Sequence, residues 1–124
     1  MSSLAAARTF QDLRVWQHAH QFVLAAYALT AGFPKHETYG LSSQMRRAAV
    51  SIPANIAEGF RRRGKADKAR FMNVAEASIE ECRYLPGSFA GPRLCETGKL
   101  AKSLDDISRM LHACSTAILT SVSF

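Results

Sequence analysis

The 124-residue sequence contains three cysteines, no long apolar run and no β-branched run with the alternating pattern of a strand. The cysteines are odd in number and form no C-x-x-C pair, which argues against a disulfide framework and a zinc site. No apolar stretch reaches the roughly 20 residues of a membrane-spanning helix, and the N-terminus lacks the apolar segment of a signal peptide. We therefore expect a cytoplasmic protein with free thiols and no membrane attachment.

Motifs of catalysis are missing as well. No Glu is followed three residues later by a His, so the inward-facing pairs of a di-iron bundle are absent. His18 and His20 are two residues apart, which on a helix directs them to nearly opposite sides. Cys82 and Cys114 occupy apolar positions of predicted helices, where cysteine is usually a small core residue, and Cys95 falls in a predicted loop. We expect no enzymatic activity, no metal and no cofactor.

Four stretches have helical spacing of apolar residues, at about residues 11–31, 40–60, 65–85 and 99–121. Residues 86–98 include two prolines and three glycines and are expected to form an irregular loop. The length and an apolar fraction of 48% fit a single folded domain, residues 1–124. Because most connections are short, the sequence predicts an all-α fold, an antiparallel up-down-up-down four-helix bundle.

The apolar residues of each predicted helix share one face. The first helix is expected to bury Val15, Trp16, Ala19, Val23, Ala26, Tyr27 and Thr30. The second should bury Leu41, Met45, Ala48, Ala49, Ile52 and Ile56, and the third Phe71, Met72, Ala75, Ile79 and Cys82. The last, with Thr97 as its N-cap, should bury Leu100, Leu104, Ile107, Leu111, Cys114 and Ile118. Leu13 and Leu24 lie on another side of the first helix, which favours assembly.

Positive charge is concentrated in the middle of the chain. Sixteen Lys and Arg against ten Asp and Glu give a net charge of +6, and residues 35–70 alone account for an excess of six. The basic cluster consists of Arg46, Arg47, Arg61, Arg62, Arg63, Lys65, Lys68 and Arg70. Six of the eight are Arg, whose planar fork of donors suits phosphate oxygens. Phe60 is the only aromatic residue that interleaves with these basic residues, so base stacking is weakly supported. The composition predicts sequence-independent, salt-sensitive contact with a nucleic-acid backbone.

A polar stripe follows the second predicted helix beside its apolar face. Its members are Gln44, Arg47, Ser51, Asn55, Glu58 and Arg62. One interpretation is a solvated face on which Glu58 pairs with Arg62. The other places Asn55 and Glu58 at a helix or subunit junction, where they bond the carbonyl near Ala49 that Pro53 leaves free, or neutralise Arg47. Pro53 is expected to kink the helix.

Three segments together resemble a known family. They are residues 10–20 (FQDLRVWQHAH), residues 33–34 followed by 39–60 (YGLSSQMRRAAVSIPANIAEGF), and residues 69–71 (ARF). They are similar to the bacterial four-helix-bundle proteins encoded within intervening sequences of 23S ribosomal RNA genes. That family is in turn similar to the accessory variability determinant proteins of diversity-generating retroelements, which are pentamers with a basic surface that binds nucleic acid and a reverse transcriptase.

The resemblance implies a homopentamer that contacts nucleic acid through Arg46, Arg47 and residues 61–63. It also implies structural or interface roles for Trp16, Gln44, Pro53, Asn55, Glu58 and Gly59. Residues 86–95 depart from the family pattern, as a pair of compensating frame changes in the gene would produce. An undisturbed reading frame in close relatives that carry the same loop would exclude that explanation.

Two functions stay open at this point. The first is a non-enzymatic oligomer that binds RNA or DNA through its basic surface. The alternative is a protein-interaction adaptor whose basic face binds an acidic partner such as a reverse transcriptase. A steep loss of binding with rising salt is typical of the first, and an association that survives nuclease treatment is typical of the second.

Overall fold

The structure, a computed structural model, describes residues 7–33, 38–87 and 94–120, and the regular elements in these ranges are all helical. The four long helices are α1 (Arg14–Ala31), α2 (Ser43–Arg61), α3 (Lys65–Gly87) and α4 (Leu94–Thr120). A 3-10 turn (Phe10–Asp12) precedes α1, and a short π-type segment (Thr38–Ser42) precedes α2. The prediction of an all-α fold with four helices is confirmed. No helix in the described ranges is both long and apolar enough to span a membrane.

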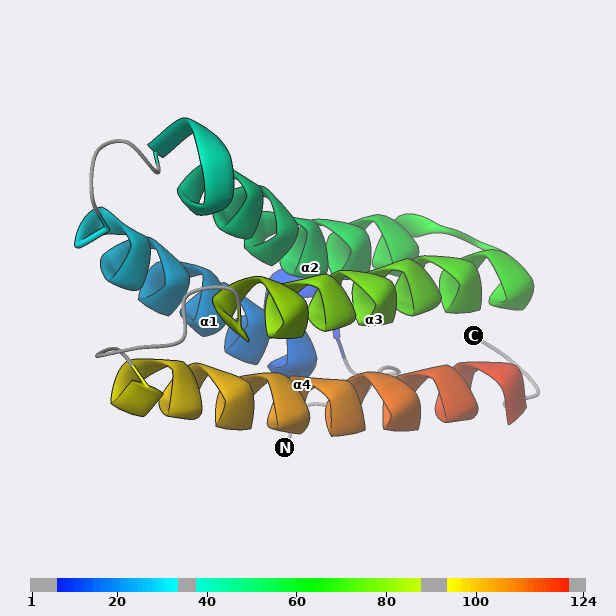
Figure 1. The fold of residues 1–124 in the computed structure, drawn as a ribbon. Coiled ribbons are helices and arrows are strands. Elements are labelled where there is room, and N and C mark those ends of the chain that lie inside the picture. The colour runs from blue at the N-terminus through cyan, green and yellow to red at the C-terminus, as the bar shows by residue number, and fades with distance from the viewer. Residues whose placement is uncertain (1–6, 34–37, 88–93, 121–124) are drawn as a thin grey trace.

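The helices pack as a ring of neighbours around one core (Figure 1). The most extensive contact is between α2 and α3, α4 lies along α3, and α1 contacts both α2 and α4. Arg83 of α3 forms an ion pair with Asp105 of α4 across their contact. Each helix therefore buries a face against two others, and the core lies between them.

The buried residues of α2, α3 and α4 agree closely with the predicted faces. The buried apolar residues of these helices include Met45, Ala48, Ala49, Ile52, Pro53 and Ile56 in α2, Met72, Ala75, Ile79, Cys82 and Leu85 in α3, and Leu100, Leu104, Ile107, Leu111 and Ile118 in α4. Leu41, Phe71 and Cys114 were expected in this set but are only half-buried. The spacing of apolar residues in these helices therefore locates the core well.

The buried face of α1 differs from the predicted one. Phe22 and Leu29 are in the core, whereas Tyr27 is 43% exposed, because contact with both α2 and α4 displaces the buried arc toward Phe22. Leu13 is buried and does not lie on an outer side, since its extended backbone precedes the helix and does not follow the helical register. Leu24 is 51% exposed, as expected.

The predicted loop over residues 86–98 is wrong at both ends. Helix α3 continues to Gly87 and α4 begins at Leu94, so Thr97 lies inside α4 and is not its N-cap. Proline in a last turn removes only one helical donor, and a single glycine inside a helix costs only about 1 kcal/mol. Residues 88–93 lie outside the described part of the chain.

Gly59 allows α2 and α3 to approach closely. A Cβ atom built at this position would lie 2.7 Å from Cε of Met72 and 2.9 Å from Cβ of Phe71, both in α3. These separations are shorter than side chains tolerate, so any larger residue would push the two helices apart. Gly98, inside α4, has nothing within 4 Å of the corresponding position.

We predict opposite effects for the same substitution at these two glycines. Gly59→Ala should lower the free energy of unfolding by about 1–3 kcal/mol, because the added methyl overpacks the α2–α3 contact. Gly98→Ala should raise it by about 0.5–1 kcal/mol, because alanine is the better helix former and meets no neighbour. Urea unfolding of both variants measures the difference. Equal effects would show that helix propensity, and not the close approach of α2 and α3, determines the outcome.

Candidate nucleic-acid interface

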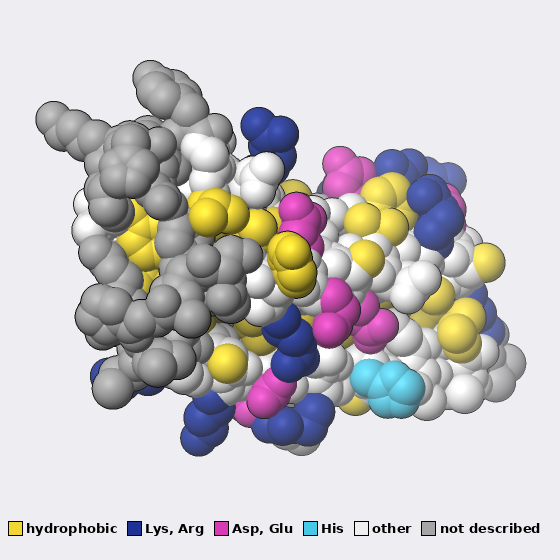
Figure 2. Space-filling view, viewed as in Figure 1, with side chains coloured by type: hydrophobic (Ala, Val, Ile, Leu, Met, Phe, Trp, Pro, Cys, Tyr) yellow, Lys and Arg dark blue, Asp and Glu magenta, His cyan; other side chains and the backbone are white. Residues whose placement is uncertain are grey.

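The structure divides the predicted basic cluster into two places. Six members lie where α2 gives way to α3, at the last residue of α2, in the short connection and in the first turns of α3. Figure 2 shows Lys and Arg side chains gathered at this end of the molecule. Arg46 and Arg47 lie at the other end of α2, about 21 Å away at roughly 1.5 Å per residue. The residues of the basic cluster therefore do not form one contiguous surface, although they are close together in the sequence.

Arg46 holds α1 and α2 together. Its Nε donates a hydrogen bond to Oγ1 of Thr30 at 2.7 Å, and its guanidinium lies 4.8 Å from the ring centroid of Tyr27. Oγ1 of Thr30 in turn donates to the carbonyl of Ala26 at 2.8 Å. Arg46 is half-buried by these contacts, whereas its neighbour Arg47 is exposed. The sequence alone predicted nucleic-acid contact for both residues and did not indicate this structural role of Arg46.

Lys68 connects α3 to the end of α2. Its ammonium donates to the carbonyl of Phe60 at 2.8 Å and lies 3.5 Å from the carbonyl of Gly59. These are among the last carbonyls of α2. That of Gly59 also accepts the backbone N–H of Arg62 at 3.2 Å, and a cation at this position opposes the negative end of the helix dipole. Burial lowers the pKa of the Lys68 amine. Lys68 therefore fixes the geometry of the connection.

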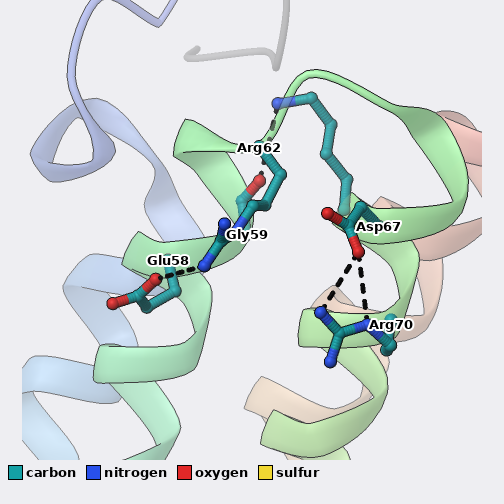
Figure 3. Close-up of polar contacts among 6 residues, drawn as sticks. Glu58, Gly59, Arg62, Asp67 and Arg70 are labelled. Atoms are coloured by element: carbon teal, nitrogen blue, oxygen red, sulfur yellow. Dashed lines mark hydrogen bonds and ion pairs between the residues drawn. The ribbon is translucent and has the colours of Figure 1, made fainter.

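Arg62 and Arg70 lie around Phe71 and are each paired with a carboxylate (Figure 3). Arg62 bonds Glu58 at 3.1 Å, and Arg70 bonds Asp67 through two nitrogens at 3.1 and 3.2 Å. Their guanidinium carbons lie 4.7 and 4.5 Å from the centroid of the Phe71 ring. Exposed ion pairs contribute little stability, but these contacts orient the two guanidinium groups and offset their charge.

Four members of the cluster form no hydrogen bond or ion pair with any residue in the described ranges. They are Arg47, Arg61, Arg63 and Lys65. The three arginines are exposed, and Lys65 is partly exposed. Three of these four cations fall within five residues, which we call the basic turn (residues 61–65). Within this turn Arg62 is paired with Glu58, whereas Arg61, Arg63 and Lys65 have no ion-pair partner in the described part of the protein.

Asn55 lies at a helix junction, but not in the manner expected. Its Nδ2 donates to the carbonyl of Ser51 at 2.7 Å and contacts Ser51 Oγ at 3.0 Å, so it does not bond the carbonyl near Ala49. Ser51 Oγ is 2.7 Å from Oγ of Ser78 in α3. The side-chain amide of Asn55 lies one helical turn after Ser51 and so reaches the Ser51 carbonyl. The polar contacts from Asn55 through Ser51 to Ser78 join α2 to α3.

Glu58 follows the simpler interpretation, since it pairs with Arg62 one turn later on an exposed face. Pro53 is buried within α2, and Gln44 is exposed. Trp16 is half-buried between the Phe10 ring, at 5.0 Å edge-to-face, and the His20 ring, stacked at 5.0 Å. Among the described residues no three His, Cys, Asp or Glu side chains gather as a metal site would require.

The two described thiols are poor nucleophiles. Burial raises the pKa of Cys82 to about 12, with a further contribution from the nearby Glu81 carboxylate. Burial also raises the pKa of Cys114. Cys82 is the core residue that was predicted, whereas Cys114 is half-buried and packs against the core, and the side chain of Cys95 lies outside the described part.

A family model described as the 23S rRNA-intervening sequence protein matches residues 11–113. The chain belongs to this family. The match includes α1, α2, α3 and most of α4, and thus the whole basic cluster and the polar stripe. Residues 8–10, which precede α1, fall outside it. A search of curated proteins found no match to the chain.

In this member of the 23S rRNA-intervening sequence protein family, we predict that Lys68 stabilises the end of α2. Lys68→Met should lower the free energy of unfolding by about 1–3 kcal/mol, because the carbonyl of Phe60 loses a charged donor. Lys65→Met, on the same turn of α3, should change it by less than about 0.5 kcal/mol, since Lys65 has no partner among the described residues. Urea unfolding tests both, and equal losses would contradict the capping role.

Proposed function

We propose that this protein is a non-enzymatic oligomer that binds nucleic acid by contacting phosphates with the basic turn. The observation that carries the proposal is that Arg61, Arg63 and Lys65 form no hydrogen bond or ion pair with any described residue. Unpaired arginines on a surface gain most from phosphate oxygens, which accept two donors of the guanidinium at once. Lys68 and Gly59 support the proposal, because they hold the two helices on which these side chains stand.

The same proposal includes the finer architecture and the assembly. We propose an up-down-up-down antiparallel bundle, supported by the direction in which the colour of each successive helix runs in Figure 1. We also propose a homopentamer of such bundles. Exposed apolar side chains support contact between copies, including Leu24 at 51% exposure and Val50 at 42%. A ring of five copies would present five basic turns to one nucleic acid.

The oligomer and its binding are tested together. Light scattering gives the mass, which should be five times that of the 13.6 kDa chain. Titration of a short RNA and of a DNA duplex at several salt concentrations gives the slope of log affinity against log salt. A slope near zero would contradict the proposed contact with phosphates. A monomer mass would contradict the proposed assembly.

We predict that the basic turn, and not net charge, sets the affinity. Arg61→Ala/Arg63→Ala should weaken binding at least about tenfold in moderate salt and reduce the salt slope by about 1–2 for each copy that contacts the nucleic acid, because each such copy loses up to two phosphate contacts. Lys99→Ala/Lys102→Ala removes two exposed charges from α4, so this control has the same net charge as the Arg61→Ala/Arg63→Ala variant. This control should bind as the unmodified protein does. A similar loss in both variants would mean that binding follows overall charge alone.

The adaptor function is supported by a separate observation. Arg62 and Arg70 already hold carboxylates in this structure, so guanidinium groups at this end of the molecule accept acidic side chains. An acidic protein such as a reverse transcriptase would then bind in place of nucleic acid. An association with a purified reverse transcriptase that persists after nuclease treatment, in a protein that binds neither RNA nor DNA, would favour the adaptor.

A further inference from the structure

A cleft of about 420 Å³ lies between the segment before α1 and the outer side of the end of α2. Arg8, Thr9, Phe10 and Gln11 line it on one side, and residues of α2 from Ala54 to Arg61 line it on the other. This volume falls within the roughly 300–1,000 Å³ of pockets that hold small ligands. The cleft adjoins the basic turn, because Arg61 belongs to both.

The wall formed by the N-terminal segment is held in place by several contacts. Oδ2 of Asp12 accepts hydrogen bonds from the backbone N–H of Arg8 at 2.9 Å and of Thr9 at 3.1 Å, and these bonds lower the pKa of the Asp12 carboxyl. The Phe10 ring packs edge-to-face on Trp16. These contacts hold Phe10, which is in the lining, in place, so this wall of the cleft is formed before a ligand arrives.

The floor and the rim differ in chemistry. Ala54 and Ala57 have side chains too small to fill the space. Phe10 and Phe60 are also in the lining, and the Lys68 ammonium lies 5.7 Å from the centroid of the Phe60 ring. Arg8 and Arg61 stand in the lining without any hydrogen bond or ion pair from their side chains to a described residue. The cleft therefore combines aromatic and apolar residues with two guanidinium groups that form no hydrogen bond or ion pair to a described residue, and the charge of one of them, Arg8, also helps to lower the pKa of Asp12.

Glu58 distinguishes between possible occupants. Its carboxylate lines the cleft and, in Figure 3, points away from α3. One of its oxygens accepts a hydrogen bond from Arg62, and a carboxylate can also accept one from the exocyclic amine of a nucleobase such as cytosine, a donor that acidic side chains lack. Aromatic rings stack on any base, and arginines bind the flanking phosphates. The lining thus suits a nucleotide better than an acidic peptide.

We infer that this cleft takes up one unpaired nucleotide of the bound nucleic acid, with its base against Phe10 and Phe60 and its neighbouring phosphates on Arg8 and Arg61. This inference rests on the proposed nucleic-acid function and adds to it a preference for unpaired bases. The basic turn recognises phosphates whether or not bases are present, whereas the cleft requires a base. The two contributions can therefore be separated by experiment.

The experiment compares two labelled strands of about 15 nucleotides, near the upper end of the ~4–16-nucleotide footprint of single-strand-binding modules. One is oligodeoxycytidylate, and the other is an abasic deoxyribose-phosphate strand with the same number of phosphates. The unmodified protein should bind oligodeoxycytidylate at least about fivefold more tightly, since stacking of one base on an aromatic side chain contributes about 1–3 kcal/mol. Ala57→Leu, which fills the floor of the cleft, should remove this preference and leave affinity for the abasic strand unchanged.

Two further variants control the experiment. Ala54→Leu fills the cleft from an exposed position, so it gives the answer if Ala57→Leu disturbs folding. Ala77→Leu makes the same change at an exposed position of α3 outside the cleft and should keep the preference. Equal affinity of the unmodified protein for the two strands would overturn the cleft inference and leave the phosphate proposal intact. Failure to bind either strand would overturn both.

Discussion

The close approach of α2 to α3 at Gly59 is the constraint on which the rest of the structure depends. The absent side chain lets Met72 and Phe71 pack directly against the end of α2. That distance brings the Lys68 ammonium within 2.8 Å of the carbonyl of Phe60, so the end of one helix is capped by the start of the next. The connection between them is therefore short and held at both ends, and its charged side chains stand on a defined surface.

Pairing, more than composition, decides what the basic residues can do. Arg62 and Arg70 are offset by Glu58 and Asp67, Arg46 joins two helices, and Lys68 caps one. The remaining cations in the basic turn have no partner in the described ranges and are available to phosphate. The same end of α2 also forms one wall of the cleft beside the N-terminal segment. Phosphate contact and base contact would thus be adjacent functions of one helix end.

The sequence predicted the features that depend on periodicity, and missed those that depend on contacts between segments. Ile52 and Leu104 are buried as their spacing required, because a helix that packs on one side repeats its apolar residues. The direction of Arg46 was not predictable from its neighbour Arg47, since consecutive residues on a helix face different surroundings. The start of α4 was misplaced, because Gly98 disfavours a helix only weakly. The cleft was missed because Arg8 and Phe10 precede the predicted helix.

The most direct test of where nucleic acid binds is ultraviolet crosslinking of a bound RNA, followed by assignment of the crosslinked residues by mass spectrometry. This measurement reports position and does not depend on any substitution. The account predicts crosslinks within residues 8–11 and 57–65, on the cleft and the basic turn. Crosslinks concentrated on α4, or on the C-terminal half of α3, would contradict the account and place the interface on another face.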